Sequence, residues 1–567
     1  MSSPIVEDQS QTAVLNPILS DRFALKWSHL LVTLTFCIFF LYCNYIPIFH
    51  SDIWGHVAYG HWILEHHRLP VEDPFVSLAQ GVPVTATAWL GQVIFAGAEQ
   101  SLGVEWISNI FALSLLASYL LLARLFYLQT GRAGMAVAGA VLVWIVGWSR
   151  HAIVRPEIFG SVCFALLFWL IVRADPFRSR DIPDNRPVPN GHLWAVWIGV
   201  PLLFAAWANL HGSFVVGFAV LGCYGLGRAI EVARQSRSPI AVLKDRQVRR
   251  WLLLGELAIV ATLLNPYGVD LLIHTLLFPS NTNLKDIVEW YPLEMVSYEG
   301  IEIGFSWILM LVVLRHSRAR MTAADVLLLI VFTLAACMRV RMVTWYAPVL
   351  MVVLMPHVAD VVRQFGGRFS NLRVPGWCRS LSVGSFRYTL LIGLAIWMTF
   401  AFAPISHFVL GGKKRPPEHL FSRGTPREIT EYLREHPPQG QIANPQWWGD
   451  WLVWNGPPDL KVFMTTNAVH AAPEQVWRDY LAISRGRDGL ERRLERYRVN
   501  TIIVHKELQE RLARYVRRMA GWRIVHEDEV GLLAVRGVSL PENESETSTE
   551  KMSVSQRPPA KESAVGR

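Results

Sequence analysis

Charged side chains are scarce in this sequence. Only 17% of its 567 residues are Asp, Glu, Lys or Arg, whereas soluble globular chains contain about 25%. Hydrophobic residues make up 52% of the chain, and the mean hydropathy is +0.28. A composition so poor in charge argues against an ordinary soluble globular protein and indicates an integral membrane protein.

Cysteine is scarce as well, and no pair has CxxC spacing. The six cysteines are Cys37, Cys43, Cys163, Cys223, Cys337 and Cys378. They lie in apolar runs or in a basic loop, so neither a zinc site nor a disulfide framework is predicted. A basic and aromatic RNA-binding pattern is also lacking. We therefore predict no nucleic-acid partner, although the formal net charge is +9.

The N-terminal region lacks the features of a cleavable signal. Residues 1–21 are polar, the first apolar run is too long for a signal h-region, and no small-residue cleavage site follows it. We expect this run to remain as a membrane anchor, preceded by a cytoplasmic segment over residues 1–29.

Apolar runs that approach or reach the roughly 17 to 25 residues of a membrane span recur along the chain. They are residues 30–49, 106–128, 133–149, 158–173, 193–210, 214–230, 251–264, 301–314, 323–338, 342–362 and 389–407. This pattern predicts a mainly α fold, a polytopic helical bundle of about eleven spans over residues 30–410.

Arginine distribution predicts the orientation of these spans. Arginines concentrate in every second loop if the N-terminus is cytoplasmic, as the positive-inside rule requires. Two such loops contain Arg173, Arg178, Arg180 and Arg186, and Arg363, Arg368, Arg373 and Arg379. We therefore predict a multi-pass protein of the inner membrane, with the C-terminal domain on the periplasmic side.

Unusual polar residues gather at the outer ends of the predicted spans. They are Asp52, His56, Asp73, Trp89, Arg150, Arg155, Glu157, Asn209, His211, Asn265, Asp286, Glu289, Arg339 and Arg341. Polar groups at this depth are costly unless they pair or line a wet cavity. Their shared level predicts one pocket that opens outward.

The first outer loop, residues 50–105, contains the strongest acidic candidates. Residues 52–65 and 89–102 predict two amphipathic helices lying along the membrane surface. On the first, Asp52 and His56 are four residues apart and share a face. Two structural alternatives stay open: Asp52 could cap this helix, and Asp73, before Pro74, could form only a turn.

Composition changes near residue 410, where a soluble outer domain begins. We expect a linker over residues 411–425, a small α/β domain over 426–538 and a disordered tail over 539–567. Predicted strands are 461–464, 501–504, 522–525 and 530–535; predicted helices are 426–435, 473–483, 487–498 and 507–519. Trp447 to Trp451 favour either a sugar-stacking surface or a packed helix start.

Several motifs together resemble bacterial polytopic membrane glycosyltransferases of the glycosyltransferase C superfamily, related to lipid-phosphate-sugar-dependent mannosyltransferase-like proteins. The motifs are Asp-x-Trp-x-His from Asp52, Gly-x-x-Ile-Leu from Gly60, Leu-Pro-x-x-Asp-Pro-Phe from Leu69, Trp-Leu-x-Gln from Trp89, Arg155-Pro156, Trp-Ala-Asn-Leu-His-Gly from Trp207, Asn-Pro-Tyr-Gly from Asn265, and Glu289-Trp290. The resemblance implies transfer of a sugar from a polyprenyl-phosphate donor to a protein, lipid or cell-surface glycan acceptor. It further implies an acidic base in the first outer loop and basic groups that hold the donor phosphate.

Residue chemistry suggests how these roles are shared. A carboxylate can take the acceptor proton, so Asp52 is the first candidate base, with His56 and Asp73 as further catalytic candidates. Arginine matches phosphate geometry and stabilises the leaving charge. The candidates for donor phosphate or substrate binding are Arg155, Asn209, His211, Glu289, Arg339 and Arg341.

Other interpretations stay open for these residues. Arg339 and Arg341 could be snorkelling anchors, and Asn209 and His211 could bridge two helices. A divalent cation is also possible, because Asp52, His56, Asp73 and Glu289 are acceptable ligand types.

Two departures from the family pattern stand out. Thr87-Ala88 replaces an acidic residue often found before Trp89, and Thr465-Thr466-Asn467 replaces an Asp-Gly-Arg run in the C-terminal domain. The rival hypothesis is a non-catalytic membrane protein, either a transporter or a glycan-binding scaffold. The absence of evident repeats in the sequence, with charges at one membrane edge, disfavours the transporter.

Overall fold

The computed structural model describes residues 24–151, 153–174, 191–368, 384–411 and 413–537. Several predictions fall outside these residues: most of the N-terminal segment 1–29, the loop arginines Arg178, Arg180, Arg186, Arg373 and Arg379, Cys378, and the whole of the tail 539–567.

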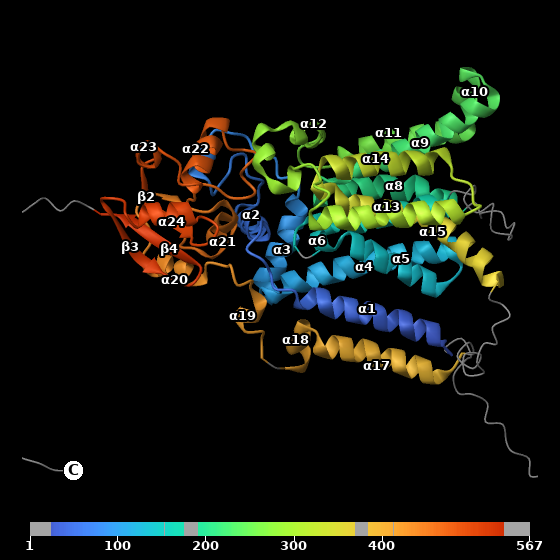
Figure 1. Ribbon diagram of the computed structural model, residues 1–567, viewed down its shortest axis with the longest axis horizontal. Coiled ribbons are helices and arrows are strands. Elements are labelled where there is room, and N and C mark those ends of the chain that lie inside the picture. Colours follow the sequence, from blue (N-terminus) through green and yellow to red (C-terminus); the bar gives the residue numbers. More distant parts are fainter. Residues whose placement is uncertain (1–23, 152, 175–190, 369–383, 412, 538–567) are drawn as a thin grey trace, which may run out of the picture.

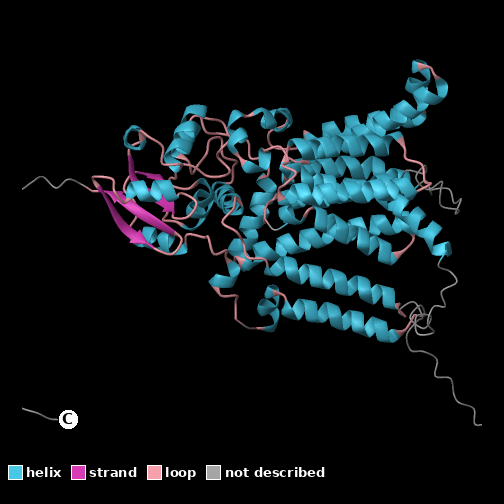
Figure 2. Cartoon of the chain, viewed as in Figure 1, coloured by secondary structure: helices cyan, strands magenta, loops and turns pink. Residues whose placement is uncertain are grey.

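An elongated bundle of roughly aligned helices forms most of the protein, and a small domain containing the strands lies at one end of it (Figures 1 and 2). The bundle helices are α1 (Trp27–Tyr45), α4 (Glu105–Thr130), α5 (Ala133–Val146), α7 (Glu157–Ala174), α8 (Gly191–Leu210), α9 (Phe214–Ser236), α11 (Arg246–Thr262), α13 (Tyr298–His316), α14 (Ala323–Met338), α15 (Val343–Arg368) and α17 (Phe386–Phe402). Each coincides with one of the predicted apolar runs.

Length and composition distinguish the helices that can cross a membrane alone. Among the described residues, 4 helices qualify, or up to 5 when the bent pair formed by α17 with Pro404–Leu410 counts as one span. The 26-residue α4 is about 39 Å long at 1.5 Å per residue, longer than the roughly 30 Å hydrocarbon core. The multi-span membrane fold is confirmed, whereas the count of about eleven spans stays a prediction.

Short helices connect the bundle helices at their ends. They are α2 (Ile53–His66), α3 (Trp89–Leu102), α6 (Trp148–His151), α10 (Pro239–Lys244), α12 (Val269–Leu277) and α18 (His407–Leu410), with single 3-10 turns η2 (Ser77–Ala79), η3 (Phe278–Ser280), η4 (Thr282–Asp286), η5 (Val288–Trp290), η6 (Val340–Met342) and η7 (Pro404–Ser406).

The two helices of the first outer loop form as predicted, and α2 packs against protein on two sides. Its apolar residues Ile53, Trp54 and Val57 are fully buried. Gly60 lets α2 approach α3 closely, because a methyl group there would overlap the carbonyl oxygen of Gln92. On its other side, Trp54 stacks on Trp454 with ring centroids 4.3 Å apart. Helix α2 is therefore enclosed between the bundle and the C-terminal domain (Figure 1).

The C-terminal domain combines a four-stranded sheet with short helices. Its elements are α19 (Pro417–Leu420), α20 (Arg427–Glu435), β1 (Gln441–Ala443), α21 (Gln446–Asn455), α22 (Glu474–Ser484), α23 (Leu490–Arg496), β2 (Val499–His505), α24 (Glu510–Val516), β3 (Trp522–Glu527) and β4 (Gly531–Arg536). The strand order is β1-β2-β4-β3. β1 pairs with β2 in parallel, and the other pairs are antiparallel.

One predicted strand is wrong, and one strand escaped prediction. Residues 461–464 form only a bridge between Val462 and Val76. Their apolar character has another cause: Val462, Phe463 and Met464 are fully buried where the domain meets the first outer loop. β1 has three residues, too few for alternation to reveal it.

Main-chain hydrogen bonds join the C-terminal domain to the first outer loop. The Ile48 amide donates to the Leu420 carbonyl at 2.8 Å, and the Val462 amide donates to the Phe75 carbonyl at 3.0 Å. The predicted linker is also held in place, because the Arg415 amide donates to Glu105 Oε1 at 2.8 Å. These contacts fix the domain over the end of the bundle that carries residues 50–105.

Candidate functional site

A large cavity of about 1510 Å³ lies where the bundle meets the C-terminal domain, and most of its wall is apolar. Seven predicted site residues from different elements line it: Asp52, His56, Arg155, His211, Glu289, Arg339 and Arg341. The prediction that polar span ends share one pocket therefore agrees with the structure for these residues.

Arg155 lies at the centre of the charged cluster, between two acids. Its Nε is 2.8 Å from Asp52 Oδ1, and its Nη1 is 2.6 Å from Glu289 Oε1. Among the described residues, neither Arg155 Nε nor Asp52 Oδ1 has a well-directed hydrogen bond, so their contact is purely an ion pair. Arg150 Nη1 reaches Glu289 from another side at 3.2 Å. Arg155, predicted to hold phosphate, is thus occupied by carboxylates.

Two further arginines follow the end of α14. Arg341 Nη2 lies 3.7 Å from Glu157 Oε2, and its guanidinium lies 4.7 Å from the ring centre of Trp290. Arg339 donates to the Met338 carbonyl at 3.1 Å and forms no ion pair with any described residue. Arg341 therefore has an acidic partner in the cavity, whereas Arg339 has none among the described residues.

The two acids beside Arg155 differ in proton affinity. Burial raises the pKa of Asp52; the Arg155 guanidinium lowers it in part, and the charge of Glu289 raises it again. Burial also opposes ionisation of Glu289, but Arg155 and Arg150 outweigh it and hold the pKa of Glu289 well below its ordinary value. Acids whose pKa values are pushed apart serve different roles. Asp52 is the better proton acceptor, whereas Glu289 is a fixed anion.

The two cavity histidines are neutral at physiological pH. Burial, with the nearby His211 and Arg155, lowers the pKa of His56 to about 3. Burial lowers the pKa of His211 to about 4, although Glu157 opposes this shift. His56 Nδ1 lies 3.0 Å from the Gln92 amide nitrogen, so its side chain is held by Gln92 rather than by Asp52. His211 Nδ1 accepts from the Ser213 amide at 3.1 Å, which leaves the proton on Nε2.

Two predicted site residues do not line the cavity. Asp73 Oδ1 accepts from the Phe75 and Val76 amides at 2.8 and 2.9 Å, and Oδ2 accepts from the Tyr59 hydroxyl. Its carboxylate therefore builds the turn after Pro74, in agreement with the structural alternative.

Asn209 likewise joins structural elements. It accepts from Trp89 Nε1 at 2.9 Å and donates to the carbonyls of Ala205 and Leu264 at 2.7 and 2.8 Å. The structure therefore favours the helix-bridging role of Asn209. For Asp52 the capping alternative fails, because its side chain makes no cap hydrogen bond to α2.

Residues of the C-terminal domain form a wall of the cavity that the sequence did not reveal. They are Gln446, Trp447, Thr466, Asn467, Val469, His470, Trp477, Tyr480, Leu481, Ser484, Arg485, Leu508, Gln509, Glu510, Arg511 and Leu512. Only two signals pointed here: the tryptophans from Trp447 to Trp451, and the departure at Thr465 to Asn467. Neither signal places a side chain opposite Asp52.

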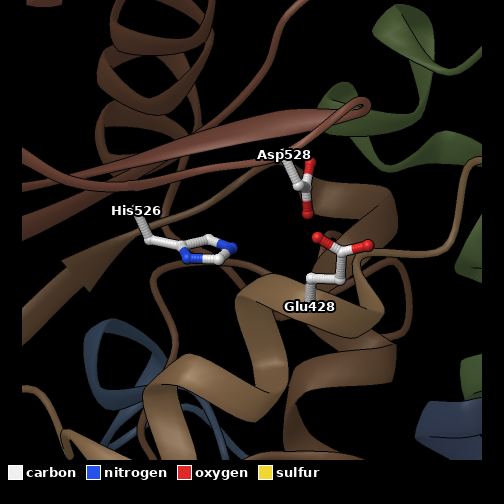
Figure 3. Close-up of side chains that lie close together, drawn as sticks. All are labelled: Glu428, His526 and Asp528. Carbon is white, nitrogen blue, oxygen red and sulfur yellow. The ribbon is translucent and has the colours of Figure 1, made fainter. Parts of the chain in front are cut away.

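The four proposed cation ligands do not form a ligand group around Asp52. Arg155 lies between Asp52 and Glu289, and Asp73 points elsewhere, so these residues do not fit a metal. Among the described residues, Glu428, His526 and Asp528 place ligand atoms within 4.8 Å of one another. Figure 3 shows their side chains pointing toward one another. None of the three lines the cavity, and Asp528 Oδ1 accepts from the Val530 and Gly531 amides of the β3–β4 turn.

Comparisons with known proteins agree with this architecture. No protein-family model matches the sequence, and no curated protein matches it. An oligosaccharyltransferase from Archaeoglobus fulgidus, tethered with an acceptor peptide, has a TM-score of 0.51 at 12% identity, over 86% of this chain and 70% of that chain. ArnT from Cupriavidus metallidurans, bound to undecaprenyl phosphate, has a TM-score of 0.50 at 12% identity, over 90% and 98%. The chain therefore shares the overall fold of these two solved membrane transferases.

Proposed function

We propose that this protein transfers a sugar from a polyprenyl-phosphate carrier to an acceptor hydroxyl or amide. The observation that carries the proposal is one cavity lined both by a largely buried carboxylate, Asp52, and by two arginines, Arg339 and Arg341. The solved structure bound to undecaprenyl phosphate supports the same carrier chemistry.

Arg339 and Arg341 are suited to the donor phosphate. Arg341 is oriented by Glu157 and Trp290, whereas Arg339 has no ion-pair partner among the described residues. A fixed guanidinium costs little reorganisation when it binds an anion, and two of them match the oxygens of a phosphate. We assign the donor phosphate to these two side chains rather than to Arg155.

An apolar branch of the cavity next to Arg339 suits the polyprenyl chain. Val331, Ala335 and Met338 line the cavity from α14 at positions i, i+4 and i+7, which share one helix face. Val216 and Ala219 of the neighbouring α9 also line it. Val331 is 39% exposed and Met338 61% exposed, so this branch reaches the outside of the bundle, where lipid lies.

Asp52 serves as the base in this proposal. The acceptor oxygen or nitrogen attacks the anomeric carbon, its proton passes to an Asp52 oxygen, and the bond from that carbon to the phosphate oxygen breaks. The electron pair stays on the released phosphate, where Arg339 and Arg341 stabilise the charge. Attack opposite the leaving group inverts the anomeric carbon. A positioned base of this kind contributes about 10² to 10⁴ in rate.

The proposal also covers the topology and the acceptor. The N-terminus lies in the cytoplasm, about eleven spans cross the inner membrane, and residues 426–538 form an outer domain above the transmembrane domain 30–410. A protein, lipid or cell-surface glycan acceptor reaches Asp52 from the side of the C-terminal wall. The neighbour tethered with an acceptor peptide supports testing peptides first.

Incubation of the detergent-purified protein with short-chain polyprenyl-phosphate sugars and mixed acceptors tests the proposal. Mass spectrometry measures released polyprenyl phosphate and glycosylated product. We expect release by the wild type and none by Asp52→Asn, which keeps the shape of the side chain. The matched control is Asp73→Asn, an acid of the same loop outside the cavity, which should retain release. Equal release by Asp52→Asn and wild type would remove Asp52 as the base.

A further inference from the structure

Three polar residues of the C-terminal domain lie against the first turn of α2, next to Asp52. Asn467 Nδ2 donates to the main-chain carbonyl of Asp52 at 3.2 Å and to Asp450 Oδ1 at 2.9 Å. The Thr466 amide donates to Asp450 Oδ2 at 2.8 Å. We name Asp450, Thr466 and Asn467 the clasp. It links α21 and the loop after it to the chain that carries the proposed base.

Gly55 makes this close approach possible. A methyl group at Gly55 would overlap Asp450 Oδ1 and Asn467 Nδ2, so the clasp lies directly against the backbone of α2. Gly55 lies one turn from the Asp52 carbonyl, which also accepts the His56 amide at 2.9 Å. Any larger residue at this position has to displace the clasp or the helix.

The burial of the Asp450 carboxylate makes the clasp energetically costly to form. Asp450 is 0% exposed and has no ion pair in the part of the chain that the structure describes. Burial, with the charge of Asp52, raises the pKa of Asp450 to about 7. A buried carboxylate without a cation is costly unless hydrogen bonds satisfy it. The Asn467 amide supplies one such bond and uses the same nitrogen to hold Asp52.

We propose that the clasp is a positioning device for Asp52, through which the C-terminal domain completes the active site. This inference rests on the proposed role of Asp52 as the base. Asn467 fixes the Asp52 main chain so that its carboxylate stays beside Arg155 in the cavity wall. Asn467 itself lines the cavity, so the domain adjoins the reacting groups rather than acting from afar.

The clasp should affect turnover far more than donor binding. A displacement of about 1 Å in a catalytic group can reduce turnover about a hundredfold. The proposed phosphate ligands Arg339 and Arg341 lie at the end of α14 and in η6, which have no hydrogen bond to the clasp among the described residues. Loss of the clasp should therefore lower kcat and leave the donor KM nearly unchanged.

Gly55→Ala is the sharpest test, and Gly97→Ala is its matched control. Gly97 lies within α3 of the same loop, and a methyl group there would meet nothing within 4 Å. Alanine favours a helix over glycine, so Gly97→Ala should be as active as the wild type and as stable or more so. We expect Gly55→Ala to lower kcat about tenfold to a hundredfold with an unchanged donor KM. Wild-type kcat in Gly55→Ala would overturn the proposal.

Asn467→Asp separates positioning from folding, because it keeps the shape of the side chain but removes the N–H donors. Protonation of the introduced carboxyl restores one donor. We therefore expect the ratio of variant to wild-type kcat to rise as the pH falls, whereas a purely structural defect would give a constant ratio. A constant ratio, or full activity at all pH values, would contradict the proposed role.

Hydrogen exchange keeps this test independent of the proposed function. Amides in the first turn of α2 should exchange faster in Asn467→Ala than in the wild type, whether or not the protein transfers sugar. If the wild type releases no carrier but exchange rises, the proposed function fails while the clasp stands. If the wild type is active and exchange is unchanged, the clasp fails alone.

Discussion

Replacing Arg155 with Gln should shift the acid limb of the pH–kcat profile to higher pH. Asp52 must be ionised to accept a proton, and the Arg155 guanidinium lowers the pKa of Asp52. Without this cation the pKa of Asp52 rises further, so a smaller fraction of the base is ionised at any given pH. Activity at neutral pH should fall and should recover as the pH rises.

The burial of the ion pair sets the size of this effect. The side chains of Arg155 and Asp52 are 16% and 14% exposed, and their atoms are 2.8 Å apart. Breaking a buried pair costs about 3 to 5 kcal/mol, against about 0.2 to 1 kcal/mol for an exposed pair. Part of this cost falls on Glu289, which keeps Arg150. At about 1.4 kcal/mol per tenfold change, we expect kcat/KM to fall about a hundredfold at neutral pH.

Arg150→Gln is the matched control for Arg155→Gln. Arg150 contacts Glu289 at 3.2 Å and does not line the cavity. Its loss should leave the acid limb close to that of the wild type. The test measures initial rates of carrier release across the pH range for the wild type, Arg155→Gln and Arg150→Gln. Identical profiles for Arg155→Gln and Arg150→Gln would refute the coupling of Arg155 to the base.

Three further predictions concern the donor and the fold. Replacing both Arg339 and Arg341 with Gln should weaken polyprenyl-phosphate binding at least about tenfold, because each charge-assisted hydrogen bond contributes about 1.5 to 3 kcal/mol. Unchanged affinity in a binding titration would mean that both residues act only as membrane anchors. Ala335→Phe should fill the apolar branch and raise the KM of long-chain donors more than that of short-chain donors; equal changes for both would place the chain elsewhere. Gly60→Ala should lower stability by about 1 to 3 kcal/mol through overpacking against α3, and a raised melting temperature would contradict that close contact.

The sequence predicted the helical framework well, because apolar runs of membrane length leave few alternatives. It also predicted that Asp52 and Glu289 both lie at the outer ends of membrane spans. It could not show that Arg155 lies between them, because the pairing joins residues more than a hundred positions apart. Burial of α2 was missed for a related reason: an amphipathic pattern predicts an apolar partner but does not distinguish lipid from protein.

The contacts of the C-terminal wall could not be predicted from the sequence either. Asn467 belongs to a run that differs from the family pattern, yet nothing in its type indicates a bond to the main chain of Asp52. Asp73 and Asn209 had structural alternatives of comparable weight, and their hydrogen bonds favour those alternatives. Contacts between distant segments, rather than local propensity, decide these cases.

The most direct test of the account measures free polyprenyl phosphate by mass spectrometry after incubation of the purified protein with a panel of polyprenyl-phosphate sugars and acceptors. Wild type and Asp52→Asn are compared at equal folding and equal donor binding. We expect carrier release by the wild type and its loss in Asp52→Asn. Release by both proteins at the same rate would contradict the role of Asp52, and absence of donor binding to the folded wild type would contradict the proposed function itself.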